Sequence, residues 1–159
     1  MTATFRKLAL STFLTVSALG TITMTSCNKE DEVCSTGYSG SNCKTEVRNS
    51  YYNSYKGSGT DNTGDTYTDW TAKFTALGTD VTKMNLQLLD SKLASVEALT
   101  VTLTTNTSFN VDQKVDGSIT TTGTGTISPS AVSLTLTQKD VVLGVTTTTT
   151  ITFNNMVKQ

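Results

Sequence analysis

Carboxylates are the only classical catalytic side chains that this chain has in quantity; its 159 residues include three cysteines and no histidine. Without histidine there is no Ser–His or Cys–His nucleophile pair and no imidazole metal ligand. The aspartates fall mostly in or beside expected turns, where Asp bonds its own backbone. They are Asp61, Asp65, Asp69, Asp80, Asp90, Asp112, Asp116 and Asp140. Nothing places two of them across a cleft as a glycosidase requires. We therefore predict no catalytic residue and a non-enzyme, with a glycan-processing enzyme as the remote alternative.

Residues 61–65 bring several oxygen donors together and are the candidate for calcium. The segment lacks the bidentate acid that an EF-hand places at the end of its loop. No Gly-rich phosphate loop, nucleophile elbow or Cys-x-x-Cys motif occurs in the sequence. We predict no metal site and no dissociable cofactor.

The first 26 residues are organised as a secretory signal peptide. Arg6 and Lys7 precede a mostly apolar stretch at residues 8–19, and small residues follow it. The stretch is too short for a membrane-spanning helix, which needs about 20 apolar residues. A buried amphipathic helix is the alternative, but the stretch has no strong helical periodicity.

The segment Met24-Thr25-Ser26-Cys27 resembles the lipobox of bacterial lipoproteins. The resemblance implies cleavage before Cys27 and a covalent diacylglycerol and palmitate anchor on that cysteine. An odd cysteine count agrees, because lipidation leaves an even pair. The alternative is cleavage elsewhere, with Cys27 free to pair. Residues 28–32 (Asn-Lys-Glu-Asp-Glu) resemble the export signal of Bacteroidota surface lipoproteins, which implies an outer-membrane, surface-exposed location; a solvated spacer is the alternative.

Cys34 and Cys43 bracket a Gly-Tyr-x-Gly turn, and the segment resembles the last loop of an EGF-like module. The other cysteines of such a module are absent, so no complete EGF domain is implied. In the oxidising compartment expected for an exported chain, the two thiols should form a disulfide. We expect this loop to lie outside the folded domain, as a rigid cap on a lipidated tether over residues 27–50. Receptor binding is the alternative role.

From residue 51 onward, hydrophobic alternation at period two predicts an all-β domain over residues 51–159. Threonine contributes 35 residues, and its branched polar side chain suits the solvent face of a sheet. Every second residue is expected to face inward, for example from Trp70 to Ala76, from Leu99 to Leu103, from Ile119 to Ile127 and from Val145 to Phe153. Eight strands are expected at 51–58, 67–77, 81–89, 98–104, 107–114, 118–128, 131–138 and 145–153. Residues 90–97 are expected to allow a short helical turn.

Short consecutive strands joined by tight turns favour one small antiparallel up-and-down barrel. The pattern resembles the calycin-like or lipocalin-like domains of Bacteroidota surface lipoproteins, although the lipocalin Gly-x-Trp motif is missing from the first strand. The segments that carry the resemblance are Tyr55-Lys56-Gly57-Ser58-Gly59, Phe109-Asn110-Val111-Asp112, Gly123-Thr124-Gly125-Thr126-Ile127, Leu134-Thr135-Leu136-Thr137 and Thr150-Ile151-Thr152-Phe153.

Two features are candidate binding surfaces. Tyr51, Tyr52 and Tyr55, with Trp70, could bind a small hydrophobic ligand, a glycan or a peptide; the alternative is that the tyrosines plug the barrel end. Residues 141–143 (Val-Val-Leu) form a contact patch if exposed and a barrel lid if folded inward, and we expect the lid.

The charge balance, 12 Lys and Arg against 13 Asp and Glu, provides no basic surplus for nucleic acid. Two functions remain for a lipid-anchored envelope protein. One is binding of a small ligand or a surface protein, and the other is a structural or adhesive module with a filled barrel. The volume inside the barrel distinguishes them.

Overall fold

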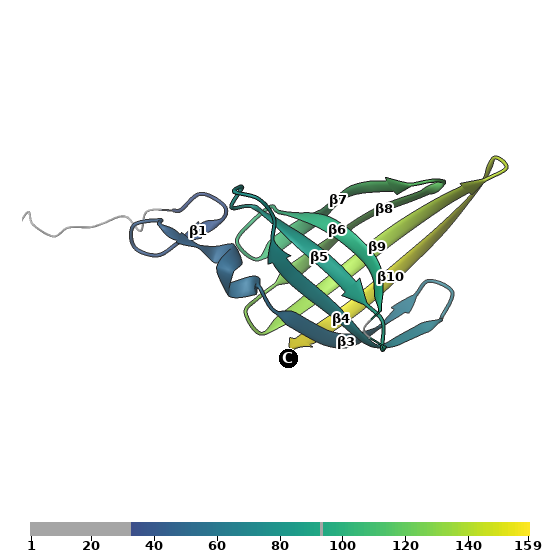
Figure 1. The fold of residues 1–159 in the computed structure, drawn as a ribbon, viewed down its shortest axis with the longest axis horizontal. Coiled ribbons are helices and arrows are strands. Elements are labelled where there is room, and N and C mark those ends of the chain that lie inside the picture. Colours follow the sequence, from purple (N-terminus) through teal and green to yellow (C-terminus); the bar gives the residue numbers. More distant parts are fainter. Residues whose placement is uncertain (1–32, 93) are drawn as a thin grey trace, which may run out of the picture. The chain divides into compact units, whose positions relative to one another are not determined.

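The computed structural model describes residues 33–92 and 94–159, so the signal peptide and Cys27 lie outside the described part. The described elements are β1 (Tyr38–Ser39), β2 (Thr45–Glu46), the 3₁₀ helix η1 (Val47–Tyr51), β3 (Ser54–Asp61), β4 (Thr66–Ala76), β5 (Lys83–Leu89), β6 (Ser95–Leu103), β7 (Ser108–Asp116), β8 (Ile119–Ile127), β9 (Ala131–Val142) and β10 (Val145–Lys158) (Figure 1). Over these ranges, no helix has the length and apolar character needed to span a bilayer.

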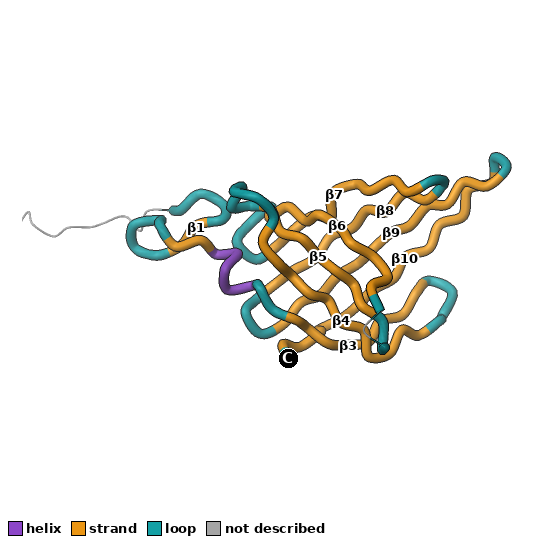
Figure 2. Tube along the Cα trace, viewed as in Figure 1, coloured by secondary structure: helices purple, strands orange, loops and turns teal. Residues whose placement is uncertain are grey.

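Strands β3 to β10 close into one antiparallel barrel. Each strand pairs with the next along the chain, and β10 returns to pair with β3. The predicted all-β up-and-down barrel of eight strands is therefore confirmed, and each predicted strand overlaps an observed one. Of the stretch 90–97, which could form a short helical turn, the part from Ser95 onward belongs to β6 instead. Figure 2 shows that strands make up most of the described chain.

The interior is filled by alternate side chains of every barrel strand. On β5, Met84, Leu86 and Leu88 are buried while the residues between them are partly exposed. Aromatic rings then meet across the centre. The ring centroids of Tyr55 and Phe74 are 5.8 Å apart, and those of Phe74 and Phe109 are 5.7 Å apart. All three rings are less than 2% exposed, so the middle of the barrel is packed with side chains.

Two glycines on β8 make room for this packing. A Cβ atom on Gly125 would lie 2.3 Å from Phe109 Cζ and 2.6 Å from the Ser133 carbonyl oxygen, and one on Gly123 would lie 2.4 Å from the Thr135 carbonyl oxygen. Strands and rings approach β8 so closely that a side chain there has no space. The Phe109 ring occupies the volume at Gly125, and the Leu136 and Val111 side chains occupy it at Gly123.

Some residues predicted to face inward are exposed. Ile119 and Val145 follow the inward alternation of β8 and β10, yet both are exposed, as is Ala76 at the end of β4. The cause for the first two is that β7 to β10 continue beyond the barrel, where no core lies opposite them. The β9–β10 hairpin projects furthest, at the end opposite to β1 and β2 (Figure 1).

We call the end that carries β1, β2 and residues 77–82, 104–107 and 128–130 the proximal end. The distal end carries the turns at residues 62–65, 91–92, 117–118 and 143–144. Successive turns of an up-and-down barrel alternate between its two ends, so this division follows from the strand order.

The predicted Cys34–Cys43 disulfide is present, but its loop does not stand apart from the barrel. Asn106, in the β6–β7 turn, bonds the loop twice: its Oδ1 accepts from Gly37 N at 2.8 Å and its Nδ2 donates to Tyr38 O at 2.9 Å. Residues 33–159 consequently form one compact unit. Our expectation of a loop outside the folded domain is wrong, because a polar turn of the barrel holds it.

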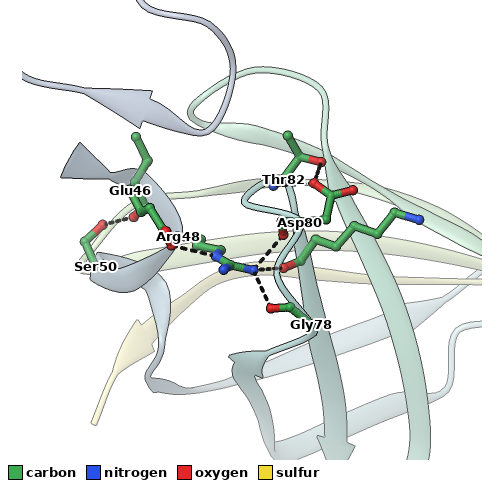
Figure 3. A network of polar contacts seen from close by, with 8 residues as sticks. Glu46, Arg48, Ser50, Gly78, Asp80 and Thr82 are labelled. Carbon is green, nitrogen blue, oxygen red and sulfur yellow. Dashed lines mark hydrogen bonds and ion pairs between the residues drawn. The ribbon is translucent and has the colours of Figure 1, made fainter. Parts of the chain in front are cut away.

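Arg48 makes the second connection between this segment and the barrel (Figure 3). Its residue is only 6% exposed, and its Nη1 donates to the carbonyl oxygens of Gly78, Asp80 and Lys83 at 3.4, 2.6 and 3.2 Å. Its Nε bonds Glu46 Oε2 at 3.0 Å. A buried guanidinium whose charge is paired with Glu46 thus joins η1 to the β4–β5 connection.

Candidate functional site

Tyr51 and Tyr55 lie inside the proximal end of the barrel. The Tyr51 hydroxyl donates to the Asn106 carbonyl, and the Tyr55 hydroxyl donates to the Ser128 carbonyl at 3.0 Å. The two residues are 3% and 0% exposed, and burial raises the pKa of both phenols. These rings close the barrel end, as the alternative interpretation has it, and leave no exposed face on which a ligand could stack.

Tyr52 is only half-buried, and its environment differs from that of its neighbours. Its hydroxyl oxygen is buried and has no hydrogen-bond partner among the described residues. Burial raises the pKa of this phenol, while the nearby Arg48 charge acts in the opposite direction. Tyr51 and Tyr55 are buried in the core, so they do not form an exposed site together with Tyr52.

Trp70 lies toward the distal end, in a different group of rings. Its centroid is 5.4 Å from that of Tyr67 and 5.7 Å from that of Phe153. Tyr67 in turn donates its hydroxyl to Asp61 Oδ2 at 2.9 Å. The structure therefore does not bring the four predicted ligand residues into one site: the tyrosines belong to the proximal end and Trp70 to a distal aromatic wall.

The Asp61 carboxylate, the candidate for calcium, is occupied by its own hairpin. Oδ1 accepts from Thr63 N at 2.9 Å, Thr63 Oγ1 at 2.7 Å and Asp65 N at 3.0 Å. These bonds, first of all that of the Thr63 hydroxyl, lower the pKa of Asp61 to about 2. Across the described ranges, no group of three or more acidic or cysteine side chains gathers that could hold a metal ion. The role visible for Asp61 is to shape the β3–β4 turn.

Asp61→Asn should change how stability depends on pH. The folded-state pKa of about 2 lies below the ordinary value of 3.8, so the carboxylate stabilises the fold above about pH 4 and loses this effect as pH falls toward 2. We expect the variant to melt at a lower temperature at neutral pH and to lose less on acidification. Melting followed by circular dichroism between pH 2 and 7 measures this.

Asp116→Asn is the matched control, since it removes a carboxylate from another hairpin of the distal end. It should leave the acid-induced loss of stability as in the parent protein. If both variants trace the same curve, the Asp61 bonds do not stabilise the fold.

The β9–β10 hairpin carries the main exposed apolar cluster of the described residues, which we call the apolar tip: Val141, Val142, Leu143 and Val145. The expected barrel lid is wrong, because β9 runs on to Val142 and the chain reverses only at Leu143 and Gly144, past the end of the core. The contact-patch alternative describes what is found. Val115 and Ile119 on the neighbouring β7–β8 hairpin are also exposed.

Leu143 is unusual for its position. It is 99% exposed, and both turn residues have positive φ, 52° at Leu143 and 78° at Gly144. This conformation suits Asn, Asp or Gly and costs other residues roughly 1–2 kcal/mol. Turn stability therefore does not account for a leucine here, whereas contact with another apolar surface would.

The outer face of β7, β8 and β9 holds shallow grooves of about 380 and 360 Å³. Asn110, Thr124 and Thr135 line both of them. Hydroxyl, amide and apolar residues line them, none of them charged, and the threonines among them confirm threonine as the solvent face of the sheet. The grooves lie outside the barrel and provide no enclosed site.

The site that stands out is thus a protruding apolar tip on a barrel whose centre is filled. No protein-family model, no curated protein and no solved structure matches this chain.

Proposed function

We propose that this protein is a non-catalytic, lipid-anchored envelope protein that displays its distal end for contact with a surface partner. The observation that carries the proposal is the exposed apolar tip on a barrel packed with rings. A carrier of small molecules needs an empty interior, and here side chains take up the centre. The filled barrel favours a docking or adhesive module over a lipocalin-type carrier.

The anchor in this proposal is the lipobox-like Cys27, with residues 28–32 directing the chain to the outer face of the outer membrane as in Bacteroidota lipoproteins. Several acyl chains hold a protein on a membrane where one does not. Cys27 precedes Val33, the first described residue, by six positions. The EGF-like disulfide loop follows and is bonded to the proximal end, so the anchor would keep that end toward the membrane.

The orientation follows from this attachment. The apolar tip belongs to the end opposite to the loop (Figure 1) and would point away from the membrane that holds the anchor. An exposed apolar cluster in that position is suited to another protein.

Intact-mass spectrometry of the full-length protein, purified from the membranes of a bacterium that processes lipoproteins, tests the proposal. Denatured protein should begin at Cys27 and carry the mass of its acyl chains. Under native conditions the mass should be the same, because no small molecule is retained. The Cys27→Ser variant should remain an uncleaved precursor without acyl mass.

An added mass under native conditions alone would show a carrier and contradict the docking module. A mature chain without acyl chains would contradict the anchor.

A further inference from the structure

Strand β10 has a partner on only one side over its first half. It pairs with β9 from Val145 opposite Val142 onward. Its pairing with β3 begins only at Ile151, opposite Asp61. Residues 145–150 therefore present a sheet edge beyond the closed part of the barrel.

The backbone groups on this edge can be assigned from the turn. In a two-residue hairpin, the closing pair, here Val142 and Val145, exchanges its hydrogen bonds, so alternate residues direct theirs outward. On β10 the outward residues are Thr146, Thr148 and Thr150.

Asn62 covers the inner part of the edge. Thr150 N donates to its Oδ1 at 2.9 Å, Asn62 N donates to Thr150 O at 3.0 Å, and its Nδ2 donates to Thr148 O at 3.4 Å. No described residue bonds the N–H or C=O of Thr146 or the N–H of Thr148. The open ladder thus runs from the turn to Thr148.

This edge lacks the features by which proteins protect exposed strands. Lys, Pro, bulges and inward charges normally prevent edges from pairing. Residues 145–152 are all Val, Thr or Ile, which are β-branched and uncharged. They form a segment with high β-propensity and no gatekeeper.

The unpaired part of β4 provides a contrast within the same molecule. Its pairing with β5 begins only at Thr71, so residues 66–70 also have a free side. There Asp69 has a φ of +59°, the register with β3 shifts, and Lys56 pairs with the Asp69 carboxylate at 3.2 Å. The β4 edge is irregular and charged, whereas the β10 edge is regular and neutral.

We propose that the β10 edge pairs with the same edge of a second copy of this chain, antiparallel about a two-fold axis at Thr146. This inference rests on the proposed function and names the partner of the distal end. The two copies would form one sheet across their hairpins, an isologous contact in which each edge supplies what the other lacks.

A second copy fits the edge for three reasons. Thr146 of each copy meets Thr146 of the other, so the unpaired N–H and C=O of both Thr146 residues are satisfied. Val145 of each copy lies opposite Thr147 of the other. The two Val145 side chains are then diagonal neighbours across the contact, so the two apolar tips lie close together. The pairing also stops short of Asn62, and it places no charged side chain in the ladder.

A lipid surface fits less well. Membrane insertion would leave the Thr146 backbone groups without partners in an apolar medium, and it would bring Asp116 and Asp140 of the two hairpins toward the headgroups. A protein strand satisfies both the backbone edge and the apolar tip.

The contact is short, so we expect it to be weak in free solution. Two anchored copies share one membrane surface, which raises their effective concentration. Pairing should therefore be efficient on the membrane and dilution-sensitive in detergent.

Cysteine cross-linking of the full-length lipoprotein in phosphatidylcholine vesicles tests the pairing. In the Thr146→Cys variant the introduced thiol is the one left unpaired, because Cys34 and Cys43 are bonded and Cys27 carries the anchor. Residues opposite each other in a hydrogen-bonded antiparallel pair have Cα atoms about 5.5 Å apart, within disulfide range. Mild oxidation should yield a covalent dimer.

Thr124→Cys is the control. Thr124 is exposed on β8, and its backbone lies between paired neighbours on both sides. We expect at least about tenfold less dimer from it, since random collision is its only route. Equal yields from the two variants would overturn the proposal.

A second substitution separates strand pairing from loose contact of the tips. Thr148→Pro, added to Thr146→Cys, puts a proline ring on the open edge, opposite Gly144 of the second copy, where it blocks the approach of the partner strand, and it leaves the bonds to β9 in place. It should abolish the cross-link. An undiminished cross-link would show that tip collisions, not a ladder, join the copies.

The outcomes distinguish this inference from the proposed function. Acylated protein that gives no cross-link above the control refutes the second copy as partner and leaves the anchored module intact. If the thiol is shielded from a water-soluble alkylating reagent in vesicles without forming a dimer, the membrane covers the tip and the pairing is refuted. Protein without acyl chains refutes the anchor. The pairing of β10 edges can then still be tested by cross-linking the Thr146→Cys variant at high concentration in solution, where a dimer supports it and no dimer refutes it.

Discussion

Val101→Asp should leave the barrel unfolded in buffer without denaturant. Val101 is 0% exposed in the middle of β6, where it lies opposite Met84 on one side and Val111 on the other, both buried. A carboxylate at this position would have no partner, and an unpaired buried charge costs several kcal/mol. Small domains have about 5–15 kcal/mol of total stability, so most of the folded population should be lost.

Ala98→Asp is the matched control, because it introduces the same charge on the opposite, exposed face of β6. Its variant should lose about half a kcal/mol. Thr102 is a less suitable control, since its hydroxyl donates to Asp112 Oδ1 at 2.8 Å and an aspartate there would face a like charge. Urea melts monitored by the fluorescence of Trp70, the single tryptophan, measure both variants. Equal losses would mean that β6 is buried on both faces, which a single-walled barrel does not allow.

Arg48→Met should release the disulfide-closed segment from the proximal end. Methionine keeps the apolar stem but removes the donors that reach the carbonyls of Gly78, Asp80 and Lys83. Hydrogen bonds to charged groups contribute about 1.5–3 kcal/mol each, and water can replace part of this at Gly78 and Asp80, which are exposed. We expect a loss of about 3 kcal/mol in urea melts and faster proteolysis within residues 33–50.

Lys44→Met controls for charge, because it removes one positive charge from the same segment at an exposed position. It should change stability by less than about half a kcal/mol. If the two methionine variants are equally stable and equally resistant to protease, the Arg48 contacts do not hold the segment.

The barrel could be predicted from the sequence because its information is local. Alternation at period two places Met84, Leu86 and Leu88 on one face wherever β5 lies in space, and threonine marks the other face. Once eight such strands follow one another with short turns, few topologies remain. The point at which each strand leaves the core was harder to predict, because the alternation continues through Val145 and Ile119 whether or not a core lies opposite them.

The docking of the disulfide loop could not be predicted in this way. Arg48 finds its acceptors about thirty residues further along the chain, and a backbone carbonyl carries no sequence label. Nothing in the sequence marks Asn106 as the residue that binds the disulfide loop either, because it is one amide in a polar turn. The apolar tip did have a detectable feature: Leu143-Gly144 between two Val-containing runs has the length of a two-residue hairpin turn, which would place the valines on strands instead of in a lid.

The hydrogen bonds of Arg48 and Asn106, which we call the clamp, attach the disulfide-closed segment to the barrel. They also affect how the protein responds to mechanical load. Tension on the chain upstream of Val33 would otherwise act on the start of β3 and peel it from β4 and β10 one hydrogen bond at a time. The clamp instead passes the force sideways into the β4–β5 connection and the β6–β7 turn, where several bonds must break together. Force thus enters the barrel at the turns of its proximal end, and the hydrogen bonds of β3 to β4 and β10 are not broken one after another.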